Sequence, residues 1–430
     1  MKSKISALLV FVLFVSASIT NSLPQTKNTI ENVFTLELSF GDDNLPSEYL
    51  LARPGYIAVN NNGDIYVSDE SRIKVYTKDG KPKLIIGRPG QGPNEFSGTP
   101  NIVISPVGFI TAKALGSQSS IYYTFYTPDN KFIETKLFDS EPYLLKIEPQ
   151  LQYTSIGNYL TQILLATNEK IFYGLLTIHN ENEIIGKSYD VLAYEKSGIF
   201  KTLIKQEHIS SAVARYKGSV SHLSYFGYDM GHLEFCLLPD NKFVYTNTAF
   251  DRRIEKGKGW YKLHIVSLQT SEQIDFEIEY VPVEMEKSVI EFRQDYNSIK
   301  DEKSAITFKA VDDIMIKRAK AQIYDATFSY MINDGYYLFT AKQFRKDTTQ
   351  IIECIDLKAG KKVFSTMIAG NQRTVETTLR DGRKITEKFV DFLVTYNSII
   401  KNGYLYKIKS GPNIYPVVEK YRIDPKVYQK

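Results

Sequence analysis

A strand–turn–strand pattern recurs six times in this chain and restricts its fold more than any other feature. In each copy an apolar run leads into a tight polar or glycine turn, and a second apolar run follows. The copies are YIAVNNNGDIYVSD, NIVISPVGFITAKAL, TQILLATNEKIFYGLL, EFCLLPDNKFVYTN, FSYMINDGYYLFTA and NSIIKNGYLYKIKS, with turns centred on Gly63, Gly108, Glu169, Asn241, Gly335 and Gly403. Hairpins that recur at the interval of one blade predict an all-β chain folded as a six-bladed β-propeller.

The two ends of the chain predict how the ring closes. The last repeat has three strand-like runs, at 397–400, 404–408 and 417–422, and lacks a fourth. A spare strand-like run, VFTLELSF, stands at residues 33–40. We therefore expect the N-terminal strand to complete the last blade, because this pairing removes an open sheet edge.

The longest interval between two turns contains helical patterns. Met285, Val289 and Phe292 place one apolar stripe on a helix over 283–297, and 311–319 is a second helical candidate. These patterns predict a short helical insertion between blades 4 and 5, which is either a connector on the rim or a cap over the channel. A polar segment at 370–388 predicts a solvated hairpin.

The first residues have the pattern of a secretory leader. Lys2 and Lys4 precede an apolar run at 5–15, and small residues follow it. We expect residues 1–22 to be a signal peptide and residues 31–430 to form a single propeller domain. An uncleaved anchor is the alternative, and a lipoprotein is disfavoured because no Cys lies near the cleavage site. The expected location is the periplasm or cell envelope, with secretion as a further alternative.

The charge balance argues against one class of partner, and the setting of the two cysteines predicts their chemical state. The 53 basic and 49 acidic residues nearly balance, which argues against nucleic-acid binding because that function needs a basic stripe. No later apolar run is long enough to cross a membrane, so no span is expected after the leader is cleaved. Cys236 and Cys354 stand in apolar runs on different strands of their predicted blades, so we expect buried free thiols.

The segment at 53–96, RPGYIAVNNNGDIYVSDESRIKVYTKDGKPKLIIGRPGQGPNEF, resembles the first repeat of a bacterial six-bladed β-propeller family related to NHL-repeat proteins. The C-terminal stretch IIKNGYLYKIKSGPNIYPVVEKYRIDP is similar to the closing blade of that family. The middle of the chain matches only in the recurrence of strand-like runs and turns. The resemblance implies an exported, envelope-associated binding protein. It also implies that Asp69 ties its blade together through hydrogen bonds to a turn.

The loop GRPGQGPNEF joins the first predicted blade to the second. Its side chains Arg88, Gln91, Asn94 and Glu95 are candidates for ligand binding, although a structural connector is the preferred interpretation. Asn94 stands where the family usually has Gly. Asn tolerates a positive φ, so we expect the shape of this loop to survive the difference.

A divalent-metal site on the propeller axis is the alternative to ligand binding by this loop. Propellers that act as lyases or lactonases hold a divalent metal on the axis with His and carboxylate ligands. His222, Asp229 and His232 are the residues that would supply such ligands here, but their spacing matches no known ligand motif. No cofactor is therefore predicted, and a divalent metal is kept as the alternative.

These observations favour a non-enzymatic binding or scaffold protein. We expect it to recognise a protein, peptide or glycan through its rim loops, since the chain has no nucleophile elbow and no Cys–His pair in a catalytic arrangement. The alternative is a metal-dependent lyase or hydrolase with an axial site. That alternative rests on analogy of fold alone.

Overall fold

The structure is a computed structural model with one main unit, Val33–Lys430, after the N-terminal segment. It describes residues 33–42, 44–115, 121–137, 157–166, 169–178, 183–196, 199–224, 230–284, 299–344, 348–378, 384–411 and 414–429. The expected signal peptide therefore lies outside the described residues.

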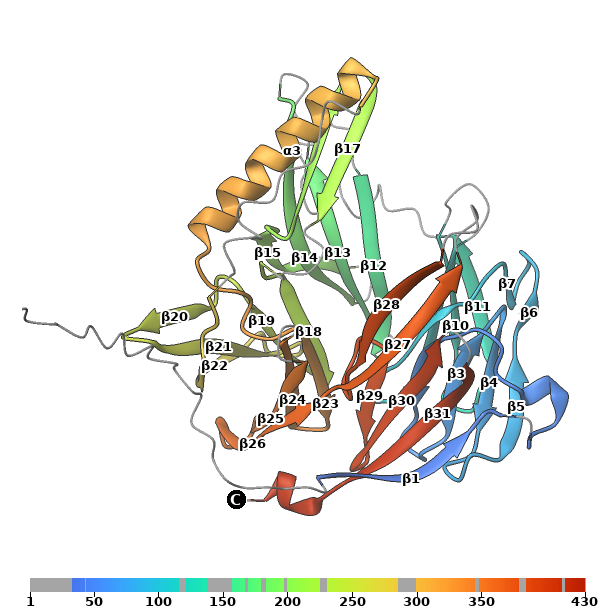
Figure 1. Cartoon of the computed structure of the whole chain (residues 1–430). Coiled ribbons are helices and arrows are strands. Elements are labelled where there is room, and N and C mark those ends of the chain that lie inside the picture. Colours follow the sequence, from blue (N-terminus) through green and yellow to red (C-terminus); the bar gives the residue numbers. More distant parts are fainter. Residues whose placement is uncertain are drawn as a thin grey trace, which may run out of the picture. The chain divides into compact units, whose positions relative to one another are not determined.

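Antiparallel sheets arranged as a β-propeller make up most of this unit (Figure 1). The first sheet holds β2 (Pro54–Val59), β3 (Ile65–Asp69), β4 (Arg72–Tyr76) and β5 (Pro82–Ile86). The second holds β8 (Asn101–Ile104), β9 (Ile110–Leu115), β10 (Ile121–Tyr126) and β11 (Phe132–Leu137). Each sheet runs up and down in chain order, as expected of strands joined by short turns.

Two further sheets repeat this order. One holds β12 (Gly157–Ala166), β13 (Glu169–Ile178), β14 (Lys187–Lys196) and β15 (Ile199–Glu207). The other holds β23 (Tyr330–Asp334), β24 (Tyr337–Phe344), β25 (Thr349–Asp356) and β26 (Lys361–Ala369). Both begin with the strand–turn–strand copies of the third and fifth repeats.

The N-terminal strand closes the last sheet, which confirms the expected pairing of the chain ends. This sheet has the order β1 (Phe34–Phe40), β31 (Ile414–Ile423), β30 (Tyr404–Gly411) and β29 (Ser398–Lys401). β1 runs antiparallel to β31, with Phe34 opposite Ile423 and Phe40 opposite Val418. The outermost strand of the sheet therefore comes from the opposite end of the chain.

The sheet of the fourth repeat departs from the four-stranded pattern. It holds β18 (Leu233–Leu238), β19 (Lys242–Asn247), β20 (Arg252–Glu255), β21 (Lys258–Ser267) and β22 (Gln273–Tyr280). β19 and β20 pair with different halves of β21, because a turn after Asn247 interrupts the strand. Among the described residues, five sheets thus have the expected four strands, so the prediction of six such blades is corrected to five.

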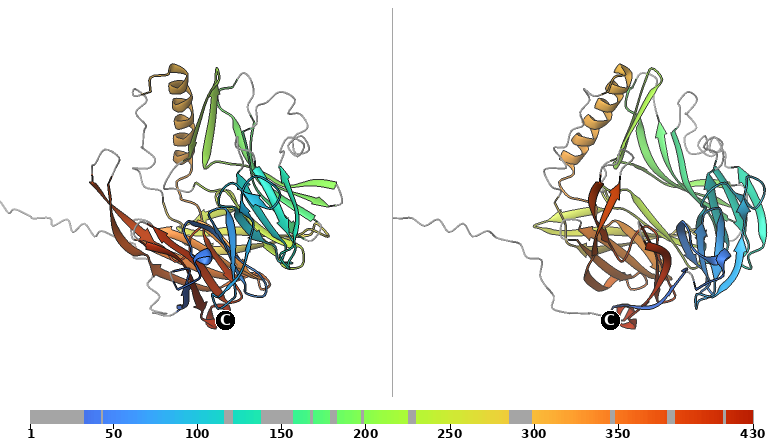
Figure 2. Two further views of the ribbon diagram at one scale, coloured as in Figure 1. Left: turned by 90° about the vertical axis from the view of Figure 1, so that its right-hand side faces the viewer. Right: turned by 45° about the vertical axis from the view of Figure 1, so that its right-hand side comes forward.

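A helix and a hairpin pack together beside the third sheet. The helix α3 (Glu302–Ala321) packs on β16 (Ser211–Tyr216) and β17 (Ser219–Ser224), as both figures show (Figures 1 and 2). Val311, Met315 and Ala319 join the buried cluster beneath the helix. The helix confirms the insertion expected between the fourth and fifth repeats and extends well beyond 311–319, whereas most of the helix expected at 283–297 lies outside the described residues.

Several short elements complete the fold. The turns η1 (Ser47–Tyr49) and η4 (Pro425–Tyr428) are 3-10 helices, and β6 (Arg88–Pro89) pairs with β7 (Glu95–Phe96). β27 (Asn371–Thr378) pairs with β28 (Lys384–Asp391) as the hairpin expected at 370–388. No helix among the described ranges is long and apolar enough to cross a membrane.

The hydrophobic core is divided into layers between successive sheets. One cluster joins Ile57 and Ile65 of the first sheet to Tyr406 and Val418 of the closing sheet. Other clusters join the first sheet to the second, the third to the fourth repeat, the fourth to the fifth, and the fifth to the closing sheet. Among the described residues, five pairs of neighbouring sheets therefore share an apolar layer, as expected for blades that stack face to face.

Buried ion pairs fasten the segments that lead into the blades. Asp69 is fully buried and accepts hydrogen bonds from the amides of Ala52, at 3.0 Å, and Arg53, at 2.6 Å. Lys74 Nζ lies 2.7 Å from the same carboxylate and also donates to the carbonyl of Leu50. The structural role expected of Asp69 is confirmed.

Candidate functional site

The GRPGQGPNEF loop is held together by its own charged side chains. Arg88 lies 2.8 Å from Glu95 Oε1, and Glu95 Oε2 accepts a hydrogen bond of 2.8 Å from the amide of Gly92. The Gly92 amide, and after it Arg88, lowers the pKa of the Glu95 carboxyl. Both charged candidates of this loop are therefore engaged within the loop itself.

Asn94 fastens the same loop to the next sheet. Its φ is 59°, the conformation expected where the family usually has Gly. Tyr126 donates a hydrogen bond of 2.6 Å to Asn94 Oδ1, and the Asn94 amide donates one of 3.3 Å to Thr135 Oγ1. Gln91 is exposed. This geometry favours a connector, while the ligand role of Arg88, Gln91, Asn94 and Glu95 stays a prediction.

The three residues considered for a metal site are not brought together by any described contact. His232 precedes β18, and its Nε2 lies 2.6 Å from Glu234 Oε1. His222 pairs through its backbone with Val213 in the β16–β17 hairpin, but its side chain and all of Asp229 lie outside what the structure describes. Among the described residues, no group of three His, Cys, Asp or Glu side chains could hold a metal ion. The divalent-metal alternative stays a prediction.

Both cysteines are free and buried, which confirms the expectation for them. Cys236 lies on β18 and Cys354 on β25. Burial raises the pKa of each thiol, to about 12 for Cys354. These thiols are therefore protonated at neutral pH and poorly suited to act as nucleophiles.

A cavity of about 290 Å³ lies where the first strands of the sheets meet. The strands β2, β8, β18, β23 and β29, here called the inner strands, all contribute to its wall. Its apolar lining consists of Val59, Val103, Ile104, Pro106, Phe235, Cys236, Leu237, Pro239, Met331, Ile332, Ile399 and Ile400, with Gly335. Its polar lining consists of Asn333, Tyr396, Ser398 and Lys401. We call this space the axial cavity.

The axial cavity follows the length of an inner strand. Its lining runs from Tyr396, before β29, to Lys401 at the end of β29. A second hollow of about 370 Å³ shares Val103, Ile399 and other lining residues with it and reaches Tyr56 and Asn101. The two hollows are therefore neighbouring parts of one space between the inner strands.

The turns of the repeats form one rim of this space. Asn61 Nδ2 donates a hydrogen bond of 2.9 Å to the carbonyl of Pro106, and Asn402 Nδ2 donates one of 3.4 Å to the carbonyl of Asn61. Asn333 Nδ2 donates one of 2.9 Å to the carbonyl of Leu237. Turns that are remote in the sequence are therefore bonded to one another.

Asp334 links two of these turns through its carboxylate. It accepts a hydrogen bond of 2.9 Å from the amide of Asn402 and one of 2.7 Å from the amide of Gly403. Tyr428 donates a third, of 3.1 Å, from its hydroxyl. Sequence reasoning located these turns but did not identify the residues of the cavity beneath them, because the inner-strand runs carry no motif.

Lys401 is the charged side chain of the axial cavity. Burial lowers the pKa of its ammonium, although the nearby Asp334 carboxylate opposes this shift. Among the described residues, Lys401 makes no side-chain hydrogen bond or ion pair. An ammonium in a partly buried apolar setting without such a partner is unusual, because burial of an unpaired charge is costly.

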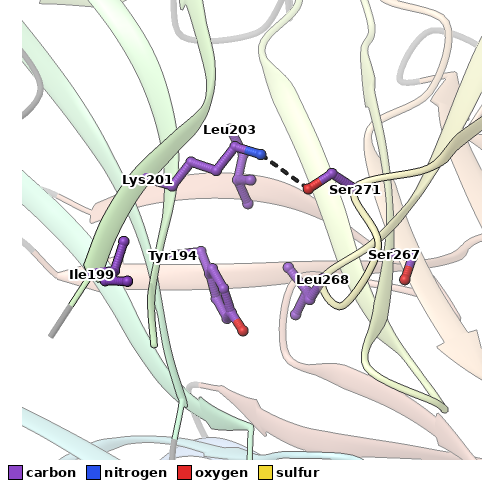
Figure 3. A pocket seen from close by; sticks show the side chains of 7 residues that line it. All are labelled: Tyr194, Ile199, Lys201, Leu203, Ser267, Leu268 and Ser271. Carbon is purple, nitrogen blue, oxygen red and sulfur yellow. Dashed lines mark hydrogen bonds between the residues drawn. The ribbon is translucent and has the colours of Figure 1, made fainter. Parts of the chain in front are cut away.

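A separate groove of about 350 Å³, which shares no lining residue with the two hollows, lies between β15 and the turn that follows β21 (Figure 3). Ile199 and Leu203 line one side, and Leu268 lines the other. Lys201 Nζ crosses the groove and donates a hydrogen bond of 3.0 Å to Ser271 Oγ. The charged group of this groove is already partnered, so the axial cavity is the better candidate site.

No protein-family model matches the chain, and no curated protein matches it. Solved structures similar to it include a member of the DUF4221 family from Bacteroides vulgatus, with 12% identity over 91% of this chain and 98% of that chain and a TM-score of 0.38. An α-L-arabinanase from Penicillium chrysogenum, solved with arabinobiose, has 11% identity over 91% of this chain and 97% of that chain and a TM-score of 0.34. A protein of unknown function from Bacteroides caccae has 11% identity over 73% and 81%, with a TM-score of 0.30. Likeness of this degree is no ground for assigning an activity to the chain.

Proposed function

We propose that this protein is an exported, non-enzymatic propeller that binds its ligand at the rim of the axial cavity. In this proposal the bonded turns contact a protein, peptide or glycan, and an apolar group of the ligand enters the cavity. The observation that carries the proposal is that five inner strands line one apolar space beneath a rim of cross-linked turns. Ligand pockets commonly combine an apolar wall with a few polar groups, and rigid sheets position such loops well.

The lining favours a peptide or protein over a glycan. Val59, Ile332 and Ile399 offer no hydrogen-bonding side-chain groups. A sugar ring packed against these three side chains would lose water from its hydroxyls without gaining side-chain partners from them, which costs free energy for each hydroxyl. A leucine-like side chain would gain by the same burial.

Export and the relation to NHL-repeat propellers belong to the same proposal. Export is supported by the leader pattern at residues 1–22, and the relation by the repeat at 53–96, whose Asp69 makes the expected bonds. N-terminal sequencing of protein recovered from the cell envelope tests export. A chain that begins after a cut between Ser18 and Ser22 supports export, and cytoplasmic protein that still begins at Met1 contradicts it.

The binding proposal is tested with a neutral peptide, acetyl-Gly-Gly-Leu-amide, titrated into the mature protein and followed by NMR. We expect saturable binding at one site. Ile399→Trp should abolish it, because the larger ring fills the cavity, whereas the control Ile133→Trp lies on the outer strand β11 and should leave it unchanged.

Absence of saturable binding of this peptide to the unmodified protein would overturn a peptide or protein as the ligand of the cavity. Equal binding by Ile399→Trp and by the unmodified protein would also overturn it. Val103→Phe is the second cavity-filling variant if Ile399→Trp does not fold, because Val103 lines both hollows.

A further inference from the structure

We propose that the axial cavity recognises a carboxylate joined to an apolar group, and that Lys401 Nζ binds this carboxylate. The inference rests on the proposed binding function and names the chemistry of the ligand. Its basis is the coincidence of one unpartnered ammonium with an otherwise uncharged, mainly apolar wall.

The charge of the cavity is positive. Among the described residues that line it, Lys401 is the charged side chain, and none is an aspartate or glutamate. Asn333, the polar residue that faces the same rim, already donates to the carbonyls of Leu237 and Gly335. The remaining hydrogen-bonding capacity of the rim thus includes the ammonium, which donates only.

The nearest acid does not neutralise this ammonium by direct contact. Asp334 raises the pKa of Lys401 through space, but its oxygens accept from the Asn402 and Gly403 amides and from the Tyr428 hydroxyl. Burial outweighs this carboxylate and lowers the pKa of Lys401. A bound anion would reverse that effect, because an opposite charge at close range favours the charged form of the amine.

The position of Lys401 orients the ligand. Lys401 ends β29, directly before the Asn402–Gly403 turn at the rim, whereas Ile399 and Ile400 precede it along the wall. A carboxylate bonded to Lys401 therefore lies at the rim, and the apolar group attached to it extends along the inner strands. Charge-assisted hydrogen bonds of this kind are about twice as strong as neutral ones.

Two ligands share this chemistry. One is the carboxyl terminus of a peptide that ends in an apolar residue, and the other is a small organic acid with an aliphatic tail. The cavity volume of about 290 Å³ lies near the lower end of ligand pockets, which suits a single side chain or a short tail.

The experiment compares acetyl-Gly-Gly-Leu as the free acid with the corresponding amide, at fixed ionic strength. For the unmodified protein we expect the acid to bind about tenfold more tightly or better, as expected of one hydrogen bond to a charged group. Lys401→Met should reduce the ratio of the two affinities to about one, and Lys401→Arg should retain a preference for the acid. The control Lys81→Met replaces an exposed lysine at a hairpin turn outside the cavity and should keep the full ratio.

Octanoate and 1-octanol form the second pair and distinguish the two sources. A preference for octanoate that Lys401→Met removes, without binding of either peptide, supports the carboxylate inference and identifies a small organic acid. If the neutral probes bind but neither acid binds more tightly, the carboxylate inference is overturned while the proposed function stands. If none of the four probes binds, both are overturned.

Discussion

The first sheet and the sheet of the fourth repeat are fastened by ion pairs of different chemistry. In the first sheet, the Lys74 and Asp69 side chains are 7% and 0% exposed, and Nζ lies 2.7 Å from the carboxylate. In the fourth-repeat sheet, His264 Nδ1 lies 2.9 Å from Asp275 and Nε2 lies 3.4 Å from Asp251. The imidazole also stacks on Tyr245, with ring centroids 4.6 Å apart. A lysine holds its charge at any pH near neutrality, whereas a histidine does not.

The lysine–aspartate pair of the first sheet has counterparts in two other sheets. Lys342 on β24 lies 2.6 Å from Asp325, and Lys407 on β30 lies 2.8 Å from Asp391. Each lysine also donates to the carbonyl that follows its aspartate in the chain. Three sheets therefore have a lysine–aspartate link, while the link of the fourth-repeat sheet uses a histidine, whose ordinary pKa lies near neutrality.

The largest effect is expected for Asp69→Asn. The substitution leaves Lys74 buried without its carboxylate, so we expect the free energy of unfolding to fall by about 3–5 kcal/mol. Urea denaturation followed by Trp260 fluorescence measures the change. Asp129→Asn, which breaks the exposed pair with Lys131, is the control and should leave the urea midpoint nearly unchanged, because solvent screens an exposed pair. Equal effects of the two substitutions would contradict the role of the buried pair.

A smaller loss is expected for Lys342→Met in the fifth-repeat sheet. Methionine removes the buried ammonium but leaves Asp325, which is less deeply buried than Asp69, so we expect a loss of about 1–3 kcal/mol. The same denaturation experiment measures this loss. Combined with Asp69→Asn, the two losses should add, because the pairs lie in different sheets and share no partner. A strongly non-additive double variant would show that the pairs do not act independently.

The histidine link should make stability depend on pH. Burial alone would lower the pKa of His264, but Asp251 and Asp275 together raise it above its usual value. The stabilisation is therefore complete below about pH 6.5 and is lost as the pH rises through the raised pKa. We expect the unmodified protein to lose more thermal stability between pH 6 and pH 8 than His264→Gln does, as scanning calorimetry would measure. Parallel pH profiles for the two proteins would refute a titrating link.

The smallest effect is expected for Asp275→Asn. Asp275 is the more exposed of the two carboxylates, with its side chain 40% accessible. Its removal should lower the pKa of His264 only in part, because Asp251 remains 3.4 Å from Nε2. NMR titration of the imidazole measures this pKa in both proteins. An unchanged pKa would assign the whole upward shift to Asp251.

The recurring hairpins, the closure of the ring and the free cysteines followed from local patterns. The Asn402–Gly403 turn illustrates why, since its φ values of 55° and 77° are those that Asn and Gly readily adopt in a two-residue hairpin. The sequence did not predict β20, the additional strand of the fourth-repeat sheet, because the turn that precedes it carries only a weak local signal. After Asn247, the asparagine side chain accepts from the amides of Ala249 and Phe250, and this turn separates β19 from the short strand β20.

The sequence alone determined the repeats, their turns and the strand that closes the ring, because alternation and turn chemistry act over a few neighbouring residues. Only the tertiary structure decided which charges are partnered. Asp69 and Lys74 are five residues apart and bond directly, whereas Lys401 and Asp334 are remote in sequence and meet only at the rim. There the backbone amides of the next turn occupy the carboxylate, so that Lys401 is left to face the cavity without a bonded partner among the described residues. Burial of a side chain, and competition between donors for the same carboxylate oxygens, arise only when distant strands are brought together. A local sequence pattern therefore does not predict them.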